Sequence, residues 1–367
     1  MLGRRGVALL FLFLGTLIMV PLPVTAPPDL SGVVQDVQEN LVPSQAGWLS
    51  GWQHRKTHTI HGSPGAGAGY QVRFTVNFGS GTDSGSNVYC NNTTRADFGD
   101  VRFTASDGST LLDYWLESNT TERATFWVEV AADLDTDQEV CMYYGNPSAS
   151  SVSNGTATFV FFDDFEDETV GANPDTMNWK SPVGESGDYD VIGITLDPVD
   201  AENQVILVKE SGDGVTTYVY SKDLTIDRDV ALGWKWRRDG VELVYNAFIG
   251  TTTEIARWRS PTPYDHLEWR IANSDEYTDF VPAWTDCAAD TWYSCEYRFS
   301  QEGFTTHSWD DGDTFAGGYY KSYPTTSGYL RYFNVPSSHM TRSNSYWTDD
   351  VYIRNYLAPE PTHGSWV

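Results

Sequence analysis

Lysine is scarce in this chain of 367 residues, which has 6 lysines, 17 arginines and 50 acidic residues and a formal net charge of −27. Such a balance argues against the cationic surface with which proteins bind nucleic acid. Hydrophobic residues make up 40% of the sequence and aromatic residues 14%, which argues against intrinsic disorder. The length allows two domains with cores of their own. The acidity suits salty or calcium-rich water outside a cell.

Long apolar runs are also scarce, and the one that exists lies at the start. Residues 6–20 are uncharged, follow Arg4 and Arg5, and precede the small residues Val24 to Ala26. This is the pattern of a signal peptide over residues 1–26, followed by a polar linker over 27–47. The run is shorter than the ~20 residues that span a bilayer, but an uncleaved anchor remains an alternative. We therefore expect a secreted or cell-surface protein that contacts a membrane only through this segment.

Closely spaced cysteine pairs, which bind zinc, are missing. The four cysteines of an exported chain favour disulfides instead. With a domain boundary near residue 158, Cys90 would pair with Cys141, and Cys287 with Cys295. Four glycosylation sequons all lie in the first half, at Asn91, Asn92, Asn119 and Asn154.

Long segments with helical period are missing as well, and short alternating runs between turn residues predict an all-β chain. Residues 71–78 are the clearest case, with Val72, Phe74, Val76 and Phe78 on the core side and Gln71 on the water side. Such strands predict an antiparallel β-sandwich over 48–158. A second series of strands, in which Trp234 and Trp236 are expected to be buried, predicts a jelly roll over 159–356. Residues 357–367 are a tail too short to be a domain.

Several motifs carry a family resemblance. The segments 52–60, 87–89, 97–104, 112–117 and 143–147 resemble the exported-protein module called domain of unknown function 2341, over roughly residues 48–165. Residues 161–166, 178–179 and 347–354 resemble the first and last strands of a concanavalin A-like lectin/glucanase (LamG-like) jelly roll. The two modules are joined in this order in archaeal and bacterial surface proteins. The resemblance implies a surface location and glycan contact, and it assigns no activity.

Enzyme motifs are missing too. The string of paired acids typical of the glucanases does not occur, and neither does a hydrolase Gly-x-Ser-x-Gly elbow. His54, His58 and His61 are spaced three and four apart on an expected strand, where they do not converge on one metal, so we interpret them as solvated edge residues. We therefore predict no catalytic residue, although a polysaccharide-active glycosidase remains an alternative.

Calcium is the ion that fits this acidic sequence, because it takes oxygen ligands. The first and last strands of a jelly roll pair, which would bring Asp163 and Asp164 close to Asp349 and Asp350. The resemblance places a structural calcium near that junction, whereas the alternative reading is four solvated strand-edge acids. No cofactor is expected to be required.

Glycan recognition needs aromatic faces and planar polar side chains. The best candidates are a polar row formed by Arg257, Arg259, Glu268 and Arg270, with Trp258 beside it, and a stacking platform from Trp284, Tyr319 and Tyr320. A purely structural role for the same residues is the alternative interpretation. The sequence thus predicts a non-catalytic surface protein whose partner is an extracellular glycan or a surface protein, with a structural subunit of a coat or filament as the alternative.

Overall fold

In the computed structural model, residues Gln45–Val367 form one compact unit, which holds all the elements below. The structure describes residues 47–180, 191–210, 219–220, 224–225, 229–239, 244–249, 254–260, 268–271, 278–279, 289–299, 304–309, 314–320, 329–336 and 344–367. The predicted signal peptide and nearly all of the linker lie outside these residues. In the part that is described, no helix is both long enough and apolar enough to cross a membrane.

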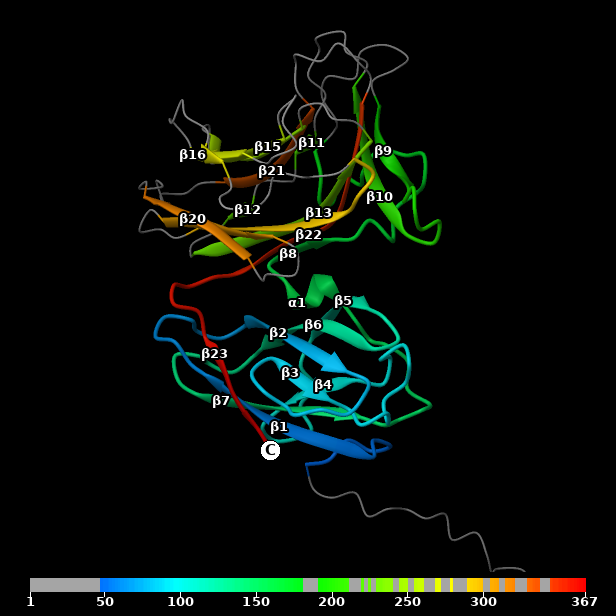
Figure 1. Ribbon diagram of the computed structural model, residues 1–367, viewed down its shortest axis with the longest axis vertical. Coiled ribbons are helices and arrows are strands. Elements are labelled where there is room, and N and C mark those ends of the chain that lie inside the picture. Colours follow the sequence, from blue (N-terminus) through cyan, green and yellow to red (C-terminus); the bar gives the residue numbers. More distant parts are fainter. Residues whose placement is uncertain are drawn as a thin grey trace, which may run out of the picture. The chain divides into compact units, whose positions relative to one another are not determined.

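The first sandwich consists of two four-stranded sheets (Figure 1). One sheet has the order β23 (Thr362–Trp366), β1 (His54–His61), β7 (Gln138–Tyr144) and β4 (Arg102–Ala105). The other has the order β3 (Asn87–Tyr89), β2 (Tyr70–Asn77), β6 (Arg123–Val130) and β5 (Tyr114–Asn119), and the short helix α1 (Gly155–Thr158) follows. The all-β prediction is therefore confirmed. The supposed tail forms β23 and belongs to this first sandwich.

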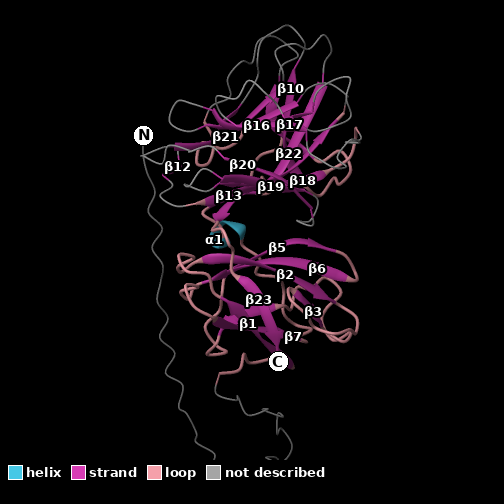
Figure 2. Ribbon diagram, turned by 60° about the vertical axis from the view of Figure 1, so that its left-hand side comes forward, coloured by secondary structure: helices cyan, strands magenta, loops and turns pink. Residues whose placement is uncertain are grey.

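The second sandwich also has two sheets (Figure 2). The larger sheet has the order β20 (Thr314–Tyr320), β19 (Phe304–Trp309), β18 (Tyr293–Phe299), β13 (Val230–Arg238), β22 (Asn344–Asn355), β10 (Gln204–Glu210) and β9 (Val191–Leu196), with β8 (Phe161–Asp163) on β22. The other has the order β11 (Val219–Tyr220), β21 (Tyr329–Pro336), β14 (Val244–Ile249), β15 (Glu254–Ser260), β16 (Glu268–Ile271) and β17 (Thr278–Asp279), with β12 (Leu224–Thr225) on β21. Antiparallel pairing of the first strand, β8, with the last, β22, is as predicted.

Alternation along β2 builds the first core as expected. Val72, Phe74 and Val76 are buried between the sheets, and Phe78 packs against them. Gln71 was expected to face water, but only 3% of its surface is exposed. Its amide donates to the Thr158 carbonyl at 2.8 Å, and its oxygen accepts from the backbone N–H of Asn355 at 2.9 Å. The outer face of this sheet is thus covered at Gln71 by α1 and by β22 of the second sandwich.

An aromatic cluster joins the two sandwiches. Trp115 and Trp127 from the first pack with Phe159, Phe162 and Tyr352, and all five are buried. Burial of such rings stabilises the junction by roughly 1.5 to 3 kcal/mol per side chain. Trp115 of this cluster also lines the candidate site described below.

A charged cluster lies beside the aromatic one. Arg354 binds both carboxylate oxygens of Glu296 at 2.8 Å and reaches Glu360 at 2.7 Å. Glu360 also accepts from the Tyr70 hydroxyl at 2.9 Å. Burial opposes the charge of Glu296, but Arg354 and then Arg298 outweigh it and lower the pKa of Glu296 to about 2. The cluster ties β2, β18 and β22 to the segment that leads into β23.

Two predictions about the first sandwich are wrong. Cys90 and Cys141 do not form a disulfide. Cys90 lies in the core between the sheets, whereas Cys141 alternates with the core residues Val140 and Met142 and therefore faces outward. Cys287 lies outside the described residues, so the second pairing stays a prediction.

The other wrong prediction concerns His58 of β1, whereas His61 of the same strand is exposed as expected. His58 is 0% exposed, so it is not a solvated edge residue. Its ring nitrogen Nε2 lies 2.9 Å from Nδ1 of His363 on β23. Strand β23, which was not predicted, covers His58. In contrast, the predicted burial of Trp234 and Trp236 is confirmed.

Candidate functional site

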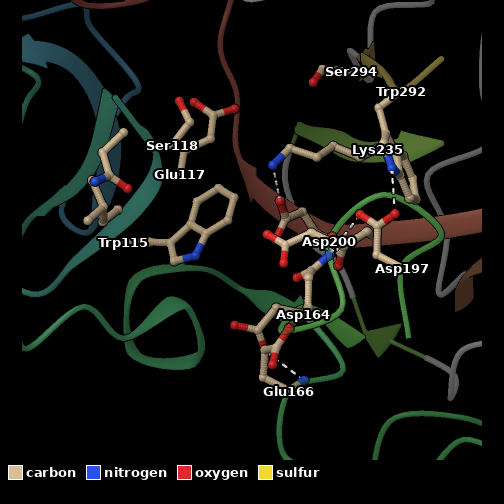
Figure 3. A pocket seen from close by; sticks show the side chains of 15 residues that line it. Trp115, Glu117, Ser118, Asp164, Glu166, Asp197, Asp200, Lys235, Trp292 and Ser294 are labelled. Carbon is tan, nitrogen blue, oxygen red and sulfur yellow. Dashed lines mark hydrogen bonds and ion pairs between the residues drawn. The ribbon is translucent and has the colours of Figure 1, made fainter. Parts of the chain in front are cut away.

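A polar cavity of about 690 Å³ opens between β5 of the first sandwich and the larger sheet of the second (Figure 3). Its lining is dominated by seven carboxylates, with Lys235 as the one basic side chain among the described lining residues. Trp115, Trp292, Asn203, Asn119, Leu116 and two serines, Ser118 and Ser294, complete the wall. The seven acids are Glu117, Asp164, Glu166, Asp197, Asp200, Asp349 and Asp350.

A bulge in β22 places two of these acids. The register with β13 pairs Gly233 with Tyr352 and Lys235 with Asp349, so β22 has one extra residue at this point. Asp350 takes up the irregularity with φ of 49°, in the left-handed region that is uncommon for residues other than glycine. A bulge bends a strand and redirects a side chain. Here it places Asp349 and Asp350 next to one another at the cavity wall.

The charges of this acid pair are partly balanced. Lys235 forms an ion pair with Asp350. Burial disfavours the charged ammonium group, but Asp350 and then Asp349 outweigh it and raise the pKa of Lys235. Burial and the neighbouring charge of Asp350 hold the pKa of Asp349 well above its usual range. The same two causes raise the pKa of Asp164 to about 6. The cavity therefore contains one carboxyl group, that of Asp164, which takes up a proton at a pH close to 6.

Hydrogen bonds fix the loop after β9 against the acid pair. Asn203 donates through Nδ2 to Asp349 at 3.0 Å and to Asp197 at 3.4 Å. The indole N–H of Trp292 donates to the other oxygen of Asp197 at 3.1 Å. One wall thus has an indole, an amide and carboxylates in fixed positions, a combination that can bind a hydroxyl-rich ligand.

Three of the four acids predicted to bind calcium line the cavity, namely Asp164, Asp349 and Asp350. Asp163 is not among the lining residues. Its carboxylate accepts hydrogen bonds from Trp179 Nε1 at 2.6 Å, Asn178 Nδ2 at 3.1 Å and the Phe165 amide at 2.9 Å. Within the described residues, no group of three or more His, Cys, Asp or Glu side chains has the arrangement of a metal site. Calcium binding stays a prediction.

The predicted glycan-binding residues are only partly brought together. Strands β15 and β16 pair Arg257 with Arg270, Trp258 with Trp269 and Arg259 with Glu268, so the polar row lies on neighbouring strands as expected. Tyr319 and Tyr320 lie on β20, which belongs to the other sheet. Trp284 lies outside the described residues. The row and the two tyrosines thus lie in different sheets.

The four sequon asparagines are all exposed, as glycosylation requires. Asn119 also lines the cavity, so a glycan attached there would stand at its rim. The side chain of Asn154 caps α1 by accepting from the Ala157 amide at 3.0 Å.

Sequence reasoning missed Asp197, Asp200, Asn203, Lys235 and Trp292. They come from β13, from the residue just before β18 and from the turn between β9 and β10, and no local motif joins them. The acid-rich turn after β9 was a signal. Its relation to the β8–β22 acids appears only when the sheet is assembled.

The family model of the domain of unknown function DUF2341 matches residues 97–182. The resemblance seen in the first half is therefore confirmed for this part of the chain. A search of curated protein sequences found no match.

Solved structures with a similar fold cover about half of the chain. The protein titled "Cellulose induced protein, Cip1" is 12% identical, with a TM-score of 0.41, and the match covers 53% of this chain and 97% of that one. An endo-β-1,4-glucuronan lyase from the fungus Trichoderma reesei is 11% identical, with a TM-score of 0.39 and coverage of 56% and 98%. Similarity at this level does not transfer a function.

Proposed function

We propose that this is a non-catalytic protein, secreted or held at the cell surface, that binds an extracellular glycan in the cavity between its sandwiches. One observation carries the proposal: carboxylate, amide and hydroxyl groups are fixed together with the Trp292 indole around a cavity of about 690 Å³. Ligand sites range over roughly 300 to 1,000 Å³, so the space suits one or two sugar rings. Carboxylates and amides accept hydrogen bonds from sugar hydroxyls, and a tryptophan offers an apolar face.

The charges of the wall restrict the glycan. Seven acids and one lysine, which is already paired, give the cavity a strongly negative potential. Uronic, sialic and sulfated sugars would be repelled. We therefore expect neutral or amino sugars as ligands. The same proposal includes export directed by the N-terminal segment. It also includes kinship to archaeal and bacterial surface proteins that have a LamG-like domain.

A glycan array with the full chain is the first test. We expect binding to neutral or amino-sugar glycans. Asp200→Asn and Trp292→Ala should weaken binding at least about tenfold, which corresponds to about 1.4 kcal/mol. Asp113→Asn is the matched control, because this exposed acid lies in the first sandwich and does not line the cavity. Equal loss in all three variants, or binding only to anionic glycans, would contradict the proposal.

The predicted row on β15 and β16 is a competing location for the glycan. Arg259→Ala should leave binding unchanged if the cavity is the site. Loss in this variant alone would move the site to the Arg257, Arg259, Glu268 and Arg270 row.

An enzymatic role is the second candidate, because the pKa of Asp164 is raised to about 6 in a cavity, as in general acids of glycosidases. Measurement of reducing-sugar release from the array hits decides between the two. We expect none. Release that disappears in Asp164→Asn would establish hydrolysis instead of binding.

A further inference from the structure

The first sandwich is completed by a strand from the other end of the chain. After β7 the chain builds the whole second sandwich and then returns, so that β23 lies beside β1 (Figure 1). Thr57 and Val367 exchange two backbone hydrogen bonds, at 2.9 and 2.8 Å. Ile60 pairs with His363, and His61 pairs with Thr362. The edge of β1 is therefore a binding site for an extended segment, occupied here by residues 362–367.

Two side chains of β23 give this edge its specificity. The Trp366 indole donates through Nε1 to the Gly85 carbonyl at 2.9 Å and packs against the core. Its ring centre lies 4.2 Å from that of His58 and 5.8 Å from that of Phe74. His363 adds the hydrogen bond to His58. His58 and Phe74 are both 0% exposed, so the sandwich needs this segment to cover its core.

The strand has the features of an exchangeable edge. It is one of the two edge strands of the sheet, its pairing with β1 is irregular between His58 and Ile60, and none of its side chains is completely buried. Residues 356–361 connect it to β22. Once Glu360 leaves Arg354 and Tyr70, six extended residues reach roughly 20 Å, which gives the strand the reach that an exchange between copies needs.

We propose that this edge also accepts residues 362–367 of a second copy of the chain, so that two copies exchange β23 reciprocally. The occupant follows from the structure, because the segment that fits the edge is carried by every copy. Exchange of an identical element needs no new contacts, and reciprocal exchange closes into a symmetric dimer. The net charge of −27 opposes the approach of two copies, so the exchange is favoured by salt. This inference does not depend on glycan binding.

Engineered cysteines can detect the exchange. His61 and Thr362 are opposite residues of β1 and β23, and both are exposed. The distance between such residues suits a disulfide. A chain with His61→Cys and a chain with Thr362→Cys are mixed at high salt, concentrated and oxidised. Neither chain can form this bond alone, so a disulfide between residues 61 and 362, identified by mass spectrometry, requires β23 of one copy on β1 of another.

Two controls make the result decisive. The double variant should close the bond within one chain, which shows that the strand is seated as described. A mixture of His61→Cys with Val170→Cys, an exposed position away from the strand, measures random collision. We expect at least tenfold more cross-link in the Thr362→Cys mixture, and a loss of this excess when Trp366→Ala is added to the Thr362→Cys chain. Equal cross-linking in both mixtures, or an excess that survives Trp366→Ala, would overturn the proposal.

Discussion

The stability of the first sandwich should fall in mild acid, because two histidines are buried beside one another. Burial, and then the charge of His363, lower the pKa of His58 from 6.5 to about 3. Burial lowers the pKa of His363 from 6.5 to about 4. The rings of Trp366 from β23 and Phe74 from β2 surround the two histidines. His61 is the other titratable side chain that lowers the pKa of His58, and the Arg73 backbone forms a hydrogen bond with His363.

The sign follows from comparison with the unfolded chain. Unfolded histidines take up protons below pH 6.5, whereas the folded pair resists protonation until much lower pH. Their contribution to stability is therefore complete above pH 6.5 and is lost as the pH falls through 6.5 toward 4 and 3. At pH 5 the solution is about 1.5 pH units below the pKa of an unfolded histidine. At about 1.4 kcal/mol per unit, each histidine then lowers the free energy of unfolding by about 2 kcal/mol.

The acids of the cavity act in the opposite direction, since the raised pKa of Asp164 favours the folded state as the pH falls below 6. A comparison with His363→Asn separates the two effects, because asparagine keeps hydrogen-bonding groups and does not titrate. We expect the free energy of unfolding, measured by hydrogen exchange of β1 amides at pH 7 and 5, to fall by about 2 kcal/mol less in the variant. Equal losses in the two proteins would refute this reasoning.

Three further predictions concern charge. Glu296→Gln should destabilise the protein by up to about 5 kcal/mol in urea unfolding, because it removes one of the two carboxylates that bind buried Arg354. Asp97→Asn, in an exposed pair, should have little effect, and similar losses would contradict the role given to burial. Asp349→Asn should raise the melting temperature at pH 7, since it removes one of two adjacent buried charges; a lower melting temperature would show that the charge is stabilising. Sodium chloride should raise the melting temperature, given the net charge of −27, and calcium should raise it further if it binds the cavity acids; a flat response to both would contradict these expectations.

The sequence predicted those parts of the fold that depend on local alternation or on one long-range rule. Alternating Val72, Phe74 and Val76 indicated a strand and its buried face, which the structure confirms. Pairing of the first and last strands of a jelly roll brought Asp164 and Asp350 together.

The missed features depend on contacts between distant segments. Gln71 is buried because the second sandwich covers its sheet, and His58 because β23 returns to the first. Neither contact leaves a periodic pattern in the sequence. The bulge at Asp350, which completes the acid pair, depends on the register with β13 and likewise has no local signature.

A crystal structure of the full chain with a glycan identified on the array tests the central claim most directly. The account predicts a neutral or amino sugar in the cavity, in contact with Trp292, Asn203 and Asp200. A sugar bound on β15 and β16 instead, with the cavity empty, would contradict it.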